Sequence, residues 1–232
     1  MVQLKMNYND LENIYESWKT RYGNETYRYI SAILAEAKQS HKTEWLHDHP
    51  DGDHEQSWRA FKGKNLEKLI YHMLEVEVAG LGLGIFNGNA LERTNPANLS
   101  LAQDKVRRGL LVHFGEFDFL PDIDLVIYDP RTSECKVIAV ISSKVTLRER
   151  IAQTGYWKLK LLEAPVTRGI RVYFVTPDED ATLRSRTNMK KGRAIVEFDT
   201  DGAYVLSGQE VEQNDKVKSF DHFVDDLKKL IS

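Results

Sequence analysis

Apolar residues at helical spacing dominate the N-terminal third of the chain. Between residues 8 and 38 they recur every three or four positions, which predicts two amphipathic helices with a break at residues 23–24. A second periodic stretch over residues 58–74 predicts a longer helix. The His- and Asp-rich residues 47–54 lack the i, i+4 histidine spacing of a helical metal site, so we interpret them as a solvated loop.

The pattern becomes that of strands after residue 117. Residues 124–128 and 136–141 are rich in β-branched and aromatic residues and are joined by a polar turn, which predicts a β-hairpin. The second of these strands is apolar on both faces, which favours a place inside a sheet. We also expect a turn at residues 80–84, an early strand between 106 and 119, a helix over 146–162, strands over 171–175, 194–198 and 203–206, and a closing helix over 220–231.

This order of elements predicts an α/β fold with a central mixed sheet flanked by helices. Residues 58–232 are expected to form the core of the protein, with the C-terminal helix closing it. Residues 1–57 are expected to form a helical N-terminal cap.

Composition narrows the classes of protein without naming a partner. The 232 residues are 41% hydrophobic and 29% charged, so the chain can bury a sizeable core and is not mainly disordered. Because 32 Lys and Arg face 35 Asp and Glu, the net charge of −3 indicates neither nucleic acid nor an acidic partner. The chain shows neither a long apolar run nor the layout of a signal peptide, so we expect a cytoplasmic protein with no membrane partner.

The single cysteine, Cys135, excludes an internal disulfide and a Cys-based zinc site. A metal would then be held by histidines or carboxylates, which favours oxygen-ligated Mg²⁺.

Acidic and basic side chains gather where the predicted hairpin strands start and end. Asp122 and Asp124 open one strand, and alternation predicts that both carboxylates point to one face. Ser142 and Lys144 are expected to share one face of the next strand for the same reason. If the strands pair, a carboxylate pair and an ammonium group meet at one edge of the sheet, which suits Mg²⁺ held beside a phosphodiester and an attacking water.

Two motifs carry a resemblance to a known family. Pro121-Asp122 followed by Ser142-Ser143-Lys144, with a gap of 142 − 122 = 20 positions, resembles the motif of the PD-(D/E)xK nucleases. The run Ser-Ser-Lys-Val-Thr-Leu-Arg-Glu-Arg over residues 142–150 is more specifically similar to the Ser-x-Lys and Arg-Glu-Arg pattern of type II restriction endonucleases of the CCGG-type, BsaWI-like group. The resemblance spans roughly residues 58–175. It implies a homodimer that hydrolyses double-stranded DNA with Mg²⁺ at a short palindrome containing C·G pairs.

The resemblance also implies roles for single residues. Ser142 stands where the family usually has an acid, and in related enzymes with this serine a carboxylate from a helix replaces it. Glu67 has the matching position here. Asp122 and Glu67 would then coordinate Mg²⁺, with Asp124 as a second candidate ligand. Lys144 would orient or activate the water, and Ser142 would contact the site through water.

Arg148, Glu149 and Arg150 are implied to read bases in the major groove. Arginine can bind guanine O6 and N7, and a carboxylate can accept from cytosine N4. The same segment also fits a capping box, in which Glu149 returns to the backbone N–H of Thr146 and takes no part in recognition.

Each assignment has a plainer interpretation. Asp122 could be a turn residue, Asp124 an exposed strand start, Lys144 a solvated strand end and Glu67 a solvated helix residue. The basic segment over residues 184–193 fits phosphate contacts and an ordinary exposed loop equally well.

Two other functions remain open from the sequence. A repair or junction-resolving nuclease of the same fold is expected to be more basic than this chain, whose net charge is −3. A catalytically inactive, sequence-specific DNA-binding protein is compatible with Ser142 at the acid position. Such a protein would bind DNA and cut none of it when Mg²⁺ is present.

Overall fold

The computed structural model describes residues 6–147 and 151–232. The α-helices are α1 (Tyr8–Tyr22), α2 (Ile30–Asp48), α3 (His54–Gly80), α4 (Gly88–Arg93), α5 (Leu101–Arg108), α6 (Ile151–Glu163), α7 (Lys191–Asp199) and α8 (Phe223–Ile231), with short 3-10 helices at Gly23–Tyr29, Pro96–Asn98 and Phe220–His222. The strands are β1 (Gly84–Asn87), β2 (Val112–Phe114), β3 (Phe117–Phe119), β4 (Leu125–Asp129), β5 (Lys136–Ser143), β6 (Arg171–Thr176), β7 (Gly202–Val205) and β8 (Val217–Ser219).

A six-stranded mixed sheet in the order β1-β4-β5-β6-β7-β8 forms the centre of the fold. β1 pairs antiparallel with β4, and β4 pairs antiparallel with β5 as the predicted hairpin. From β5 through β6 and β7 to β8 the strands run parallel. β2 and β3 form a separate two-stranded sheet. The predicted α/β class with a central mixed sheet flanked by helices is confirmed.

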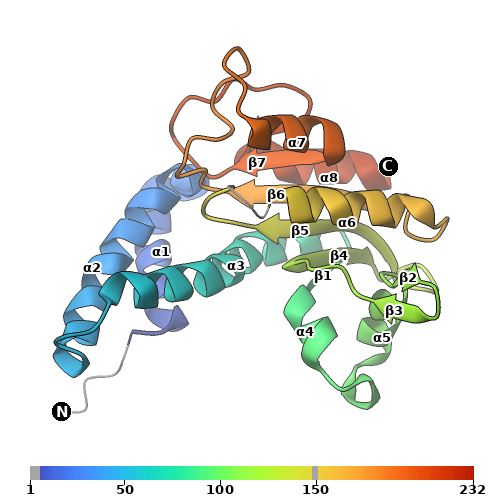
Figure 1. Cartoon of the computed structure of the whole chain (residues 1–232), viewed down its shortest axis with the longest axis horizontal. Coiled ribbons are helices and arrows are strands. Elements are labelled where there is room, and N and C mark those ends of the chain that lie inside the picture. The colour runs from blue at the N-terminus through green and yellow to red at the C-terminus, as the bar shows by residue number, and fades with distance from the viewer. Residues whose placement is uncertain (1–5, 148–150) are drawn as a thin grey trace.

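Helices cover both faces of the central sheet (Figure 1). α6 and α7 lie over one face, where Leu161 and Val196 belong to apolar clusters with sheet residues such as Val172 and Phe174. α3 and α8 lie over the other face, and one large cluster unites them with the sheet. Among the helices of the two described ranges, none is long and apolar enough for a membrane span.

α3 connects the N-terminal helices to the sheet. Asp53 caps its start by accepting from the backbone N–H groups of Glu55 and Gln56, and the helix continues for 27 residues. The large apolar cluster contains Ile33 of α2, Leu69 of α3 and Ile127 of β4, so these helices and one face of the sheet share a core. The expected boundary between residues 57 and 58 falls inside α3.

The prediction of a strand over residues 194–198 was wrong, because this segment lies in α7. Its β-branched composition favoured a strand, but helical spacing turns Arg193, Val196 and Glu197 inward, and the side chains of Arg193 and Glu197 form an i, i+4 ion pair at 2.8 Å. Tertiary contacts therefore decide the helix.

The early strand expected between residues 106 and 119 corresponds to β2 and β3, which do not join the central sheet. The strand that does join it is β1, which begins at the last residue of the turn expected over residues 80–84 and was not predicted as a strand. Glycine at position 84 permits this pairing, because a Cβ atom there would lie 2.3 Å from the ring of Tyr128.

The His- and Asp-rich stretch forms the end of α2, a short loop and the start of α3. No group of three or more His, Cys, Asp and Glu side chains within residues 6–147 and 151–232 is arranged to hold a metal ion. The prediction of a solvated loop holds only for residues 49–53, because Asp48 still belongs to α2 and His54 is buried at the start of α3.

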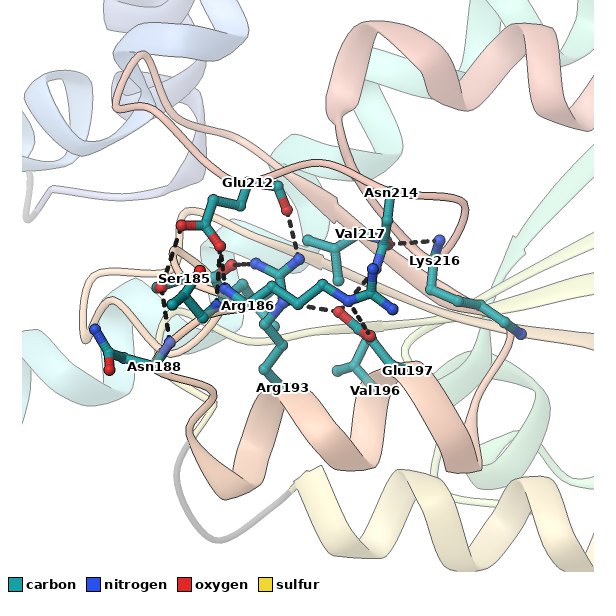
Figure 2. Close-up of polar contacts among 12 residues, drawn as sticks. Ser185, Arg186, Asn188, Arg193, Val196, Glu197, Glu212, Asn214, Lys216 and Val217 are labelled. Carbon is teal, nitrogen blue, oxygen red and sulfur yellow. Dashed lines mark hydrogen bonds and ion pairs between the residues drawn. The ribbon is translucent and has the colours of Figure 1, made fainter.

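One buried arginine fixes the irregular segments before and after α7 (Figure 2). Arg193 is 0% exposed, and its Nε donates to Glu197 Oε1 at 2.8 Å. Its two terminal nitrogens donate to the backbone carbonyls of Leu183 and Glu212. Asn214 donates to the same Glu197 oxygen at 2.8 Å. These contacts hold Leu183, before α7, and residues 212–214, after it, against the helix.

Candidate active site

A polar cleft of about 1130 Å³ lies between α3, the turn after β1 and the segments at the start of β4 and the end of β5. It is lined by Arg59, Lys62, Gly63, Lys64, Glu67, Lys68, Asn87, Asn89, Arg93, Asp124, Ser143, Lys144, Val145 and Thr146. The cleft thus combines two carboxylates with many cationic groups.

Asp124 and Lys144 are in direct contact in this cleft. Lys144 Nζ donates to Asp124 Oδ2 at 2.8 Å. The same oxygen accepts from the backbone N–H of Ser143 at 2.6 Å and from its hydroxyl at 3.2 Å. The backbone N–H of Asp124 donates to the carbonyl of Ile141 at 3.0 Å, which ties the residue to β5. Among the described residues, no side-chain hydrogen bond reaches Oδ1, so this oxygen remains available to a ligand.

Glu67 enters the cleft from α3 and is 9% exposed. Asn87 donates to its Oε1, and the amide nitrogen of Asn89 lies 3.4 Å from Oε2. Burial raises the pKa of the Glu67 carboxyl, and the charge of Asp124 raises it further. The two amides and Lys144 oppose this shift of the pKa. Two carboxylates that repel each other in this way form a site that favours a cation.

Five cationic side chains line the cleft beside these carboxylates: Arg59, Lys62, Lys64, Lys68 and Arg93. Lys62 is paired with Glu179 at 2.7 Å, so part of its charge is already compensated. A cleft with this lining suits a polyanion such as a nucleic-acid backbone, although the whole chain is slightly acidic.

The structure brings together Glu67, Asp124 and Lys144 but places Asp122 and Ser142 elsewhere. Asp122 is exposed, accepts from the side chain of Gln153 at 2.8 Å, and lines a separate hollow with aromatic residues of β2, β3 and α6. Ser142 is buried, and its hydroxyl accepts from that of Thr154 in α6 at 3.3 Å.

The expected sharing of faces was therefore wrong for both pairs of residues. β4 begins only at Leu125, and β5 already ends at Ser143. The alternation of a strand does not extend to residues outside it, so Asp122 and Lys144 do not follow the predicted faces.

The sequence did not single out Ser143, Asn87 and Asn89, which contact the two carboxylate residues, or the five cationic side chains that line the cleft. The pair of serines before Lys144 was a signal for Ser143, but the face could be assigned only once the end of β5 was known. The Asn-Gly-Asn sequence over residues 87–89 indicated a turn and gave no sign that the turn lies against Glu67.

Arg148, Glu149 and Arg150 lie outside the described residues, so their assigned role stays a prediction. The neighbouring Leu147 is described, and its backbone N–H donates to Asp180 at 3.4 Å. Thr146 lines the cleft.

Comparison with known proteins identifies related sequences. The family model for BsaWI type 2 restriction endonucleases matches residues 102–227. A protein of Methanocaldococcus jannaschii named as the type II restriction enzyme MjaVIP is 39% identical over 175 residues, which cover 74% of this chain and 76% of that protein. A Helicobacter pylori protein named as the type II restriction enzyme HpyAORF263P is 39% identical over 128 residues, which cover 55% of this chain and 64% of that protein.

Solved structures show the same fold at low sequence identity. The restriction endonuclease AgeI in complex with DNA aligns with a TM-score of 0.54 and 15% identity, covering 96% of this chain and 91% of that one. The restriction endonuclease PspGI in complex with substrate DNA aligns with a TM-score of 0.57 and 14% identity, covering 100% and 98%.

The mixed sheet and its helices therefore define a protein of the restriction-endonuclease fold, the PD-(D/E)xK class. The sequence matches identify the family within this class: the chain belongs to the BsaWI family of type II restriction endonucleases. It is a site-specific deoxyribonuclease, as the resemblance in its sequence implied. Family membership implies dependence on a divalent metal and DNA as the partner.

Proposed function

We propose that this endonuclease hydrolyses both strands of a short palindromic DNA site containing C·G pairs, acting as a cytoplasmic homodimer with Mg²⁺. The observation that carries the proposal is the cleft in which Glu67, Asp124 and Lys144 meet. We assign to Asp124 the metal-ligand role that the sequence motif gave to Asp122, because Asp124 lines this cleft and Asp122 lines a separate hollow.

The donor set of the cleft fits Mg²⁺. Magnesium prefers oxygen ligands, keeps several of its waters and is typically bound by one or two carboxylates. Glu67 and Asp124 supply such carboxylates, and the contacts of Ser143 and Lys144 with Oδ2 of Asp124 orient its other oxygen. The bound ion would neutralise charge on the phosphate and acidify a coordinated water.

Lys144 is proposed to act on the water and the phosphate. Its ammonium group already lies 2.8 Å from Asp124, within reach of groups bound to that carboxylate. From there it can orient the attacking water and stabilise the negative charge that develops on the phosphate oxygens. Its side chain is 20% exposed, so solvent competes only partly for its hydrogen bonds.

DNA would enter along the cationic lining of the cleft. Arg59, Lys64, Lys68 and Arg93 are proposed to contact backbone phosphates, which positions the duplex without reading its sequence. Base reading is proposed for Arg148, Glu149 and Arg150. Each good bidentate contact of this kind contributes about 1–3 kcal/mol of discrimination.

A homodimer is proposed because one chain has one such cleft among its described residues, whereas a palindrome presents two equivalent phosphates. Sedimentation of the protein with and without a palindromic duplex tests this part. Two chains per duplex are expected, and one chain per duplex at all concentrations would contradict it.

Cleavage of a plasmid of known sequence tests the function directly. We expect discrete fragments with Mg²⁺ and none with EDTA, and sequencing of the fragment ends should reveal one palindrome. Binding without cleavage on plasmids that contain all CCGG contexts would instead favour an inactive DNA-binding protein.

Substitutions test the assignment of the site. Asp124→Asn, Glu67→Gln and Lys144→Ala are each expected to lower the cleavage rate at least about 100-fold. Binding of a specific duplex in Ca²⁺ should persist in all three. Asp122→Asn is the matched control and should cleave within a few-fold of the wild type. Loss of cleavage in Asp122→Asn with cleavage retained in Asp124→Asn would return the metal site to the position predicted from the motif.

A further inference from the structure

The turn after β1 contacts both proposed metal ligands. Asn87 ends β1 and caps α4, with its Oδ1 accepting from the backbone N–H of Ala90 at 3.1 Å. Only the oxygen of the amide can accept this bond, so the amide nitrogen must point the other way. It points to Oε1 of Glu67 and donates to it. The cap therefore fixes the orientation in which Asn87 holds Glu67.

The next residue of the turn is attached to Asp124. The backbone N–H of Gly88 donates to the carbonyl of Asp124 at 2.7 Å. A Cβ atom at Gly88 would lie 2.1 Å from the carbonyl oxygen of Ile123, so only glycine permits this approach. Asn89 follows, with its amide nitrogen 3.4 Å from Oε2 of Glu67. Within three residues, the turn thus contacts the side chain of one carboxylate residue and the backbone of the other.

We propose that the turn Asn87-Gly88-Asn89 sets the relative position of the two carboxylates that bind the divalent cation, with Asn87 as the positioning residue. The inference rests on the proposed roles of Glu67 and Asp124. Glu67 has a flexible side chain and faces a like charge, so without a donor its carboxylate would turn away from Asp124. Asn87 holds Oε1, which presents Oε2 to the cation.

Loss of this contact should weaken cation binding without unfolding the protein. Groups that orient metal ligands typically contribute 10–100-fold to metal affinity or activity. Asn87→Ser keeps a side-chain oxygen for the α4 cap but is too short to reach Glu67. We therefore expect the Mg²⁺ concentration for half-maximal cleavage to rise about 10–100-fold in this variant. The cleavage rate at saturating Mg²⁺ should stay within a few-fold of the wild type.

Binding without turnover provides a second measurement. Titration of the free protein with Ca²⁺ by calorimetry, in the absence of DNA, should show the same weakening. The melting temperature of metal-free Asn87→Ser should match that of the wild type. Asn95→Ser is the matched control, because Asn95 caps a 3-10 helix by accepting from Ala97 at 3.0 Å and does not line the cleft.

Two further variants separate the positioning role of Asn87 from its role as the cap of α4, and from an error in the proposed metal site. Asn87→Ala removes both the cap and the donor, so it should weaken cation binding as much as Asn87→Ser does. Weakening in the alanine variant alone would assign the effect to the cap and overturn the inference. Normal Ca²⁺ binding in Asn87→Ser, together with loss of binding in Glu67→Gln, would overturn it while the proposed function stands. Unchanged binding and cleavage in Glu67→Gln would instead overturn the proposed site.

Discussion

Replacing Arg193 by methionine removes the centre of the polar network around α7 while keeping much of the side-chain volume. The guanidinium is fully buried, and its partner Glu197 has a side chain that is only 4% exposed. The variant leaves the Glu197 carboxylate with Asn214 at 2.8 Å and with Arg186 at 3.4 Å. Two backbone carbonyls, those of Leu183 and Glu212, also lose their donor.

These losses set the magnitude of the effect. Removing one partner of a buried ion pair typically costs about 3–5 kcal/mol of the free energy of unfolding, because the other charge is left uncompensated. A backbone carbonyl that stays buried without a donor adds about 1–3 kcal/mol, although relaxation of the loops recovers part of it. We expect Arg193→Met to lower the free energy of unfolding by about 5 kcal/mol, equivalent to a melting temperature about 10–20 °C lower.

Urea denaturation followed by circular dichroism measures this loss, and Arg171→Met is the matched control. Arg171 also bonds to a carboxylate, that of Asp201 at 2.9 Å, but its side chain is 48% exposed, so less than about 1 kcal/mol is expected. Adding Glu197→Gln to Arg193→Met should restore part of the stability, because it removes a buried charge whose remaining ion-pair partner is the exposed Arg186, and it keeps an acceptor for Asn214. A cost for Arg193→Met no greater than that for Arg171→Met would refute the reasoning.

Three further predictions concern acid stability, the β1–α4 turn and DNA binding. Burial alone would raise the pKa of Asp226, but hydrogen bonds from Lys218 and two other donors lower it to about 2. The ionised Asp226 carboxylate therefore contributes up to about 2 kcal/mol to the free energy of unfolding. This contribution is complete above the ordinary pKa of 3.8 and is lost as the pH falls towards 2. Urea denaturation at a series of pH values should therefore show a smaller loss of stability in acid for Asp226→Asn than for the wild type. Gly88→Ala should lower stability by about 1–3 kcal/mol through overlap with a backbone carbonyl, whereas Gly63→Ala in α3, where a Cβ atom meets nothing within 4 Å, should not lower it. Lys64→Ala should reduce the slope of log Kd against log salt by about 1 for all duplexes, and an unchanged slope would exclude a phosphate contact.

Elements decided by local pattern could be predicted from the sequence. The helix around residues 58–74 and the hairpin of residues 124–128 and 136–141 were predicted because the spacing of their apolar residues is decided within each segment. The segment over residues 194–198 could not be predicted, because its composition favours a strand and only the buried contacts of Arg193 select a helix. β1 was missed because its four residues join a sheet strand about forty positions further along the chain.

The residues of the cleft divide in the same way, into those that a sequence motif identifies and those that depend on tertiary packing. Lys144 and Glu67 could be singled out from motifs and from the resemblance to a known family. The choice between Asp122 and Asp124 could not, since it depends on the residue at which β4 begins. Asn87 could not be found either, because its contact with Glu67 joins positions 20 residues apart through the packing of a turn against a helix.

α3 connects the N-terminal helices α1 and α2 directly to the proposed active-site cleft. At about 1.5 Å of rise per residue, its 27 residues extend over about 40 Å, and Glu67 lies near the middle of this rod. α1 and α2 pack beside it, away from the strands (Figure 1). We expect any tilt of this helix to move the Glu67 carboxylate together with the lysines on its surface. By packing against α3, the N-terminal helices are thus expected to keep the cleft residues of α3 aligned with the cleft residues carried by the sheet.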